Sequence, residues 1–312
     1  MAIQISNEVV ETLMTEQISQ NTKAFNSGTA GAIVPMTDYH KGDFEELLYF
    51  QTVGDVRDRN PNANNDAVVD TLNSLTERGV KKYFYKDIEY KITDIKRYGK
   101  DPDALAVRIG EDLGRLVTAA MLNKGLLAAV AAIGAGANTI YDGSAGKANI
   151  KTINSTLRLF GDMANNIKAL IMRSNSYFNI NESGIDSGLD TVASGILYNA
   201  TPATMNRKAY VTDSTSLDAG DNKEWILGLV PGAIVVKESE ERLLHTEIVT
   251  GKENAVLRVH LEGAFTISVK GYAYKDTAGA APNDATLGAS ANWEQVATSI
   301  KNGAGVLAKV AQ

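Results

Sequence analysis

Cysteine is absent from the 312 residues of this chain, and tryptophan, histidine and proline are scarce. Without cysteine the protein has no disulfide framework, no thiolate metal site and no cysteine nucleophile, so its stability has to come from packing and association. The first residues carry acidic side chains and no basic start, and no apolar run long enough for a signal peptide or a membrane-spanning helix follows them. We therefore expect synthesis in a cytoplasm without export by the usual route.

An excess of basic residues is also missing. The chain has 31 Lys and Arg against 37 Asp and Glu, a formal net charge of −6. Dedicated nucleic-acid-binding proteins neutralise phosphates with an excess of cations, so this charge argues against that class, whereas a shell that only surrounds DNA has no such requirement. The 44% hydrophobic and 22% charged fractions are typical of a soluble globular protein, long enough for two domains or for one elaborated domain.

No segment of the chain matches a standard catalytic or cofactor-binding motif at all of the residues that the motif requires. The segment GAGANT has Thr139 where a dinucleotide loop needs its third glycine, and it follows a predicted helix where a strand is required. The Gly146-Lys147 pair has Tyr141 in place of the first phosphate-loop glycine, and Ala148 in place of the following Ser or Thr. We predict no catalytic residue, no cofactor-binding residue and no metal ligand in this chain, and no cofactor.

Histidines and acidic clusters are the remaining candidates for chemistry. His40, His245 and His260 are far apart in the sequence and form no paired-ligand motif. A histidine in a predicted strand, such as His260, is more often a surface or cross-strand residue than a ligand. An enzyme would need these histidines to converge with acids such as Asp213 or Glu247. Two acidic clusters are typical of solvated faces rather than of a metal site: Glu45-Glu46 and Glu238-Glu240-Glu241.

Residues 44 to 98 predict an extended hairpin. Apolar residues are dense from Phe44 to Val56, and RDRNPNANND then forms a solvated turn around Pro61. Residues 80 to 98 form the most regular predicted strand, with one apolar side: Phe84, Ile88, Tyr90 and Ile92. Lysines among aromatics can also bind single-stranded nucleic acid, but acidic residues interrupt them, which favours a two-faced strand or a subunit contact.

A long helix is predicted from Asp103 to about Ile133. Asp101 suits the N-cap and Pro102 the first helical position, and Gly134 and Gly136 end the helix. At ~1.5 Å per residue this rod spans roughly 45 Å. Its apolar residues follow helical spacing: Leu105, Ile109, Leu113, Leu116, Val117, Ala120 and Met121.

The remaining segments mix helices and strands. The N-terminus has four apolar residues at helical spacing, Val9, Val10, Leu13 and Met14, followed by a polar run that contains glycine. Residues 1 to 31 are therefore either an arm that orders only against a neighbouring subunit or a frayed terminus. Downstream, the pattern predicts these elements: a helix over 151–166, a buried strand opening onto a loop over 168–180, a strand over 208–211, an apolar segment over 225–240 broken at Pro231-Gly232, a β-rich stretch over 243–274 with a hairpin at Gly251-Lys252, and a short final apolar run.

The order of these features resembles the common capsid fold of tailed-bacteriophage major capsid proteins, which encapsulin shells share. The segments that carry the resemblance are IGEDLGRLVTAAMLNKGLLAAV (109–130), KALIMRSNSYFNI (168–180), GLVPGAIVV (228–236) and ANWEQVATSIKNGAGVLAKV (291–310). The resemblance implies an α+β fold, and we expect the following division: an N-terminal arm (1–35), an extended β-hairpin loop (43–98), a peripheral domain with a long spine helix (99–140 and 236–284) and an axial domain (141–235 and 285–312).

The same resemblance implies a structural protein and not an enzyme. We expect many copies to form hexamers and pentamers of an icosahedral shell around double-stranded DNA, without sequence-specific binding and without a membrane partner. Scaffold, portal and decoration proteins are further candidate partners, and the protein is expected in the virion after synthesis in the bacterial host cytoplasm. Three alternatives stay open: an encapsulin-like nanocompartment, another virion protein of the tail tube or decoration type, and an enzyme with an unrecognised site.

Overall fold

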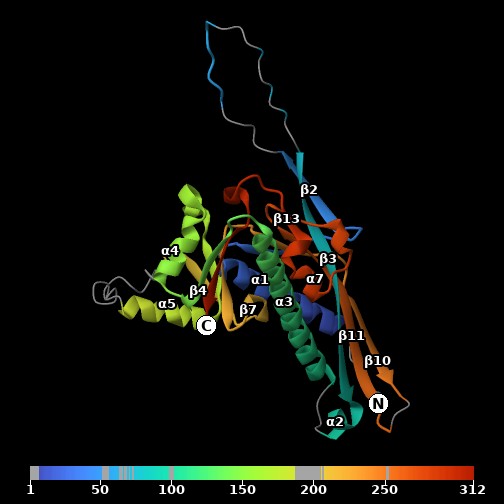
Figure 1. The fold of residues 1–312 in the computed structure, drawn as a ribbon. Coiled ribbons are helices and arrows are strands. Elements are labelled where there is room, and N and C mark those ends of the chain that lie inside the picture. Colours follow the sequence, from blue (N-terminus) through green and yellow to red (C-terminus); the bar gives the residue numbers. More distant parts are fainter. Residues whose placement is uncertain are drawn as a thin grey trace.

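Two β-sheets and one long helix organise the chain (Figure 1). The computed structural model describes residues 7–50, 56–62, 66, 69, 71, 74–97, 102–186, 205, 207–250 and 253–312. One sheet has eight strands and the other has six, so the fold is of the mixed α+β kind that the sequence predicts. The long helix contacts strands of both sheets, and its buried side chains belong to the same apolar core as theirs.

The long helix α3 (Pro102–Ala135) confirms the predicted spine helix to within two residues at its C-terminus. Its 34 residues span about 51 Å at ~1.5 Å per residue. The helix ends where Thr139 Oγ1 donates to the Ile133 carbonyl at 2.5 Å and thereby satisfies a free backbone acceptor. The predicted apolar stripe is buried except at Leu116, which is 46% exposed, and at Ala120, which is partly buried. With a mean hydropathy of 1.8, α3 is apolar and long enough to cross a membrane, but core helices of water-soluble proteins share this composition.

The eight-stranded sheet is built around β11. Its order is β1-β9-β11-β3-β12-β13, with β10 beside β11 and β2 beside β3. The antiparallel pairing of β10 with β11 confirms the hairpin predicted within the β-rich stretch, and Leu257, Val259 and Leu261 alternate with less buried residues. The strands are β1 (Ile33–Thr37), β2 (Phe44–Phe50), β3 (Ser74–Lys91), β9 (Ile234–Glu238), β10 (Leu243–Val249), β11 (Val256–Val269), β12 (Tyr272–Tyr274) and β13 (Trp293–Gln295).

The six-stranded sheet has the order β4-β14-β8-β5-β6, with β7 beside β8. Its central strands are almost wholly buried, and the predicted strand over 208–211 and the final apolar run are both confirmed. The strands are β4 (Ile140–Lys147), β5 (Ala169–Met172), β6 (Lys208–Val211), β7 (Asp218–Gly220), β8 (Lys223–Leu229) and β14 (Gly305–Ala311). The other short elements are α2 (Ile92–Arg97), α4 (Ile150–Arg158), α5 (Ser174–Asp186), α7 (Asp284–Leu287) and the 3₁₀ turns η1 (Gly161–Asn166), η3 (Thr215–Leu217), η4 (Asp276–Ala278), η5 (Ser290–Asn292) and η6 (Ile300–Asn302).

The N-terminal segment packs within its own subunit. Residues Asn7–Gly28 form helix α1, which lies against α3 and buries Val10 and Met14. A Cβ atom on Gly110 would lie 2.8 Å from the Val10 carbonyl oxygen, and one on Gly114 would lie 2.9 Å from that of Met14. These two glycines let the helix backbones approach closely. The expectation that this segment orders only against a neighbour is therefore wrong for residues 7–28.

Three element boundaries also differ from the sequence prediction. The strand expected over 168–180 ends at Met172, and helix α5 follows because Asp213 accepts hydrogen bonds from the backbone N–H and the hydroxyl of Ser174. Strand β3 begins at Ser74 and ends at Lys91, so Ile92 opens α2. The helix expected over 151–166 is α4 followed by η1. The predicted N-cap Asp101 and the predicted turn residues Gly251 and Lys252 lie outside the described residues.

Candidate assembly surface

Strand β3 carries different structures at its two ends. Toward its N-terminal end it pairs with β2 in a hairpin that leaves the body of the subunit, and toward its C-terminal end it pairs with β11, next to β10 and α2 (Figure 1). We call the three strands β3, β11 and β10 at this second end the ribbon. Both ends extend beyond the core, so their outer surfaces are the candidate contacts with other molecules.

The hairpin exposes adjacent leucines. Leu47 is 49% exposed and Leu48 is 64% exposed, and because successive strand residues point to opposite faces, each face of the hairpin presents one of them. Val56 and Val69, between the two strands, are 100% and 80% exposed. Large apolar side chains on both faces of a two-stranded hairpin are typical of a surface that another molecule covers.

Cations anchor the base of the hairpin to the sheet. Arg78 on β3 binds Glu46 across the hairpin at 2.6 Å and Asp276 at 2.5 Å. Lys237 on β9 pairs with Asp38 and Glu45, and although burial lowers the pKa of Lys237, these carboxylates together raise it above its ordinary value. The base of the hairpin is therefore fixed, while its outer part has only its own two strands.

A second anchor lies at the midpoint of β3. The side chain of Lys81 is 2% exposed, and its Nζ donates to the His40 carbonyl oxygen at 3.1 Å and to Glu240 at 3.0 Å. Glu238 pairs with Arg242, and burial raises the pKa of this carboxyl group. The predicted acidic clusters are thus only partly solvated: four of their members hold cations within the fold, at Arg78, Lys81, Lys237 and Arg242.

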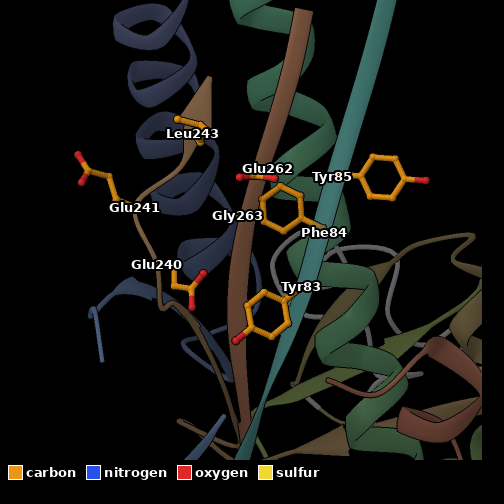
Figure 2. Close-up of a pocket in the computed structure, with 8 residues that line it drawn as sticks. All are labelled: Tyr83, Phe84, Tyr85, Glu240, Glu241, Leu243, Glu262 and Gly263. Atoms are coloured by element: carbon orange, nitrogen blue, oxygen red, sulfur yellow. The ribbon is translucent and has the colours of Figure 1, made fainter. Parts of the chain in front are cut away.

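A pocket of about 320 Å³ lies where the hairpin end meets the ribbon (Figure 2). Aromatic residues of β3 line one side, and two acidic residues before Leu243 and one on β11 line the other: Tyr83, Phe84, Tyr85, Glu240, Glu241, Leu243, Glu262 and Gly263. The Tyr83 hydroxyl donates to Asp43 at 2.9 Å, and burial, this bond and the charge of Glu240 raise the pKa of Tyr83 to about 12. The phenol stays a hydrogen-bond donor at neutral pH, and the pocket presents an acidic, aromatic surface.

Charged residues form a ladder on the outer face of the ribbon. Glu247 on β10, Arg258 on β11 and Glu89 on β3 lie side by side, with Arg258 2.5 Å from Glu89 and 3.5 Å from Glu247. In the next rung, His245 faces His260, which faces Asp87. His260 is a cross-strand surface residue, as predicted. The acidic residues of β3 are partners of β11, which argues against nucleic acid binding along this strand.

The residues that an enzyme would need lie in three separate places. His245, His260 and Glu247 are together on the ribbon, whereas the His40 ring contacts Thr266 near the centre of the sheet, at 3.3 Å. Asp213 caps Ser174 beside the six-stranded sheet. Among the described residues, no three His, Asp or Glu side chains are grouped so that they could hold a metal ion.

Sequence reasoning missed the leucines and the anchoring cations. Two adjacent leucines in one strand indicate that both faces of that strand meet apolar surroundings, so Leu47-Leu48 carried a usable signal. No comparable local signal marks Arg78, Lys81 or Lys237, because their partners lie 32 to 199 residues away along the chain.

Comparisons with known proteins agree with the geometry. The model of the Gp13-like family, described as major capsid protein 13-like, matches residues 2–307. No curated protein matches the chain. Among solved structures, the capsid of Helicobacter pylori bacteriophage KHP30 is 12% identical and covers 90% of this chain and 88% of that chain, with a TM-score of 0.56.

Two further capsid structures share the fold. The capsid of cyanophage Pam1 is 10% identical over 89% of this chain and 88% of that chain, with a TM-score of 0.55. The capsid of Ralstonia phage GP4 is 11% identical over 90% of this chain and 87% of that chain, with a TM-score of 0.52. At such identities the structures show the fold alone, and the family match over nearly the whole chain supplies the rest: this chain belongs to the Gp13-like family of major capsid proteins.

Proposed function

We propose that copies of this chain assemble into a closed icosahedral shell by laying the β2–β3 hairpin of one subunit on the next. The exposure of Leu47 and Leu48 carries this proposal, because among the described elements β2 pairs with β3 alone. Burying such a side chain stabilises a contact by about 1.5–3 kcal/mol. Each hairpin contact is modest, but a closed shell engages many copies at once.

The contact is head-to-tail. The hairpin and the surface that it covers are different parts of the same molecule, and such heterologous contacts close into rings when the rotation between copies allows it. Hexamers and pentamers are the rings that an icosahedral shell requires. The ribbon lies at the far end of β3 from the hairpin (Figure 1), and the acidic, aromatic pocket lies between them, so in a ring both are available to a different neighbour.

The proposed division of the subunit follows the two sheets. The extended loop at 43–98 contains the hairpin, and the peripheral domain at 99–140 and 236–284 contains α3 together with β10, β11, β12 and the end of β9 from the eight-stranded sheet. The axial domain at 141–235 and 285–312 contains the six-stranded sheet, while its strand β13 pairs with β12 of the other sheet. Residues 1–35 complete the division, with α1 packed on α3.

The proposed content of the shell is double-stranded DNA held without sequence-specific contacts. The net charge of −6 and the pairing of β3 lysines with acids support this. Scaffold, portal and decoration proteins are the further partners that such a shell would take, and the subunit would be made in the bacterial host cytoplasm. A shell that purifies empty, with bound cargo proteins, would instead support the encapsulin-like alternative.

The test removes the hairpin leucines without touching the core. The double variant Leu47→Ser/Leu48→Ser should unfold within about 0.5 kcal/mol of the parent chain, because both side chains are solvated in the free subunit. Its particle yield, measured by sedimentation and negative-stain microscopy, should fall at least tenfold. Deleting Pro61 to Asn65, in the turn that the sequence predicts, should have the same effect on assembly.

A matched control is Val9→Ser, which removes an apolar side chain, 38% exposed, from α1. It should leave particle yield close to that of the parent chain. Normal yield from both hairpin variants would overturn the proposed contact, and a stable monomer of the parent chain under all assembly conditions, including added scaffold, would overturn the shell itself.

A further inference from the structure

His260 lies between two carboxylates on the outer face of the ribbon. Its Nδ1 is 2.5 Å from Asp87 Oδ1 on the neighbouring strand β3, and its Nε2 is 3.4 Å from Glu262 Oε2 on its own strand. A neutral imidazole carries one N–H and can donate to only one of them, and its other nitrogen would then turn a lone pair toward an anion. Only the protonated ring donates to both carboxylates.

We propose that His260 is a proton-dependent clamp that joins β3 to β11 at the outer end of the ribbon. When His260 is protonated, it neutralises Asp87 and Glu262 and holds the two strands through side chains as well as backbone. When the ring loses its proton, the ion pair with Asp87 that joins the two strands weakens to a hydrogen bond from a neutral ring, and the other nitrogen turns a lone pair toward Glu262. The clamp is a property of the single subunit, so it stands independently of the proposed shell.

The charged groups around His260 determine the effect of losing its positive charge. On β10, His245 faces His260 directly and Glu247 lies on the next rung, and on β3, Tyr85 and Glu89 flank Asp87. On β11 itself, Arg258 is already bound to Glu89 and Glu247. Without the His260 charge, Asp87 and Glu262 have no other ion-pair partner among the described residues, because Arg258 is bound to two other acids.

The direction of the pH dependence follows from the bonds. Hydrogen bonds to Asp87 and then to Glu262 raise the pKa of His260 above its ordinary value of 6.5. A raised pKa in the folded state means that the clamp is fully formed below pH 6.5 and is lost as pH rises through the folded value. The end of the ribbon should therefore open more readily in mildly alkaline solution.

The test uses the three histidines of the full chain as probes. Titration of the imidazole C2 protons by NMR, assigned with single His→Gln variants, should give a pKa above 6.5 for His260. The variant Asp87→Asn should weaken proton binding by His260 about three- to tenfold, since it removes the nearest carboxylate. The matched control Glu253→Gln removes an acid from the neighbouring loop and should leave this pKa unchanged.

Amide hydrogen exchange distinguishes a histidine that holds the two strands together from one whose pKa is raised without any effect on the strands. After correction for the intrinsic effect of pH, protection of residues 256–262 in the parent chain should fall about threefold between pH 6 and pH 8.5. In His260→Gln the corrected protection should not change with pH. A His260 pKa at or below 6.5, equal shifts in Asp87→Asn and Glu253→Gln, or the same exchange profile in parent and His260→Gln would overturn the proposal.

Discussion

The six-stranded sheet and the β2–β3 hairpin differ in where their apolar surface is covered. All four residues of β5 and most of β14 are buried inside the subunit, whereas the hairpin leaves Leu47 and Leu48 about half exposed or more. The central strands of the six-stranded sheet are covered on both faces by other elements of the same chain. A two-stranded hairpin that no other element covers is marginally stable in water, so a partner that packs on it would stabilise it. The six-stranded sheet completes its core within the subunit, and we propose that the hairpin completes its own against a neighbour.

The largest effect is expected from breaking the buried sheet at Gly305. This residue has φ of +151°, and a Cβ atom there would lie 2.0 Å from the Gly228 carbonyl oxygen on β8. Gly305→Ala should therefore cost about 3 kcal/mol or more, through a backbone clash and strain together. Chemical unfolding followed by the fluorescence of Trp225 and Trp293 measures it.

The control for that prediction is Gly232→Ala. Gly232 has φ of +69° but open space around its Cα, so only the conformational penalty of about 1–2 kcal/mol applies. If both variants lost the same free energy of unfolding, the close approach of β14 to β8 would not contribute to the stability of this sheet.

A smaller effect is expected where α1 meets α3, the N-terminal packing that the sequence did not predict. Gly110→Ala/Gly114→Ala places methyl groups less than 3 Å from the carbonyl oxygens of Val10 and Met14, so α1 has to move outward. We expect a loss of about 1–3 kcal/mol from this overpacking. Gly146→Ala, with no atom near its Cβ position, should change stability by at most about 0.5 kcal/mol. Unfolding curves that coincide for the double variant and the control would show that α1 does not pack here.

The smallest effect is expected at Lys81, where the hairpin end of β3 meets the ribbon. Glu240→Gln leaves the nearly inaccessible ammonium without its carboxylate and should cost about 1–2 kcal/mol. Lys81→Met removes the buried charge and leaves Glu240 in contact with water, so it should cost less. Thermal unfolding of both variants checks this order, and a greater loss in Lys81→Met would reverse our account of the pair.

Much of the fold could be predicted from the sequence because its signals are local. The Pro102 start and the glycines near residue 134 bracket α3, and strict alternation marks β11 on its own. The hairpin was also predictable, since a solvated turn separates two apolar runs. The exposed leucines could have been found in the same way, because adjacent apolar residues in one strand imply apolar surroundings on both faces.

The remaining features depend on contacts that no local pattern records. Helix α1 is polar over most of its length, and its place on α3 depends on two glycines about 100 residues away. Helix α5 begins where it does because Asp213 caps Ser174 and the buried Glu224 accepts from Ser176. The rung of His245, His260 and Asp87 forms only once β3, β11 and β10 are in register.

The most direct test of this comparison is hydrogen exchange on free subunits and on assembled particles of the same preparation. Our account predicts that peptides covering Phe44–Phe50 exchange at least about tenfold more slowly in particles, because a neighbour covers the hairpin, while peptides covering β5 and β14 are unchanged. Equal exchange of the hairpin in both states, or new protection confined to the six-stranded sheet, would contradict it.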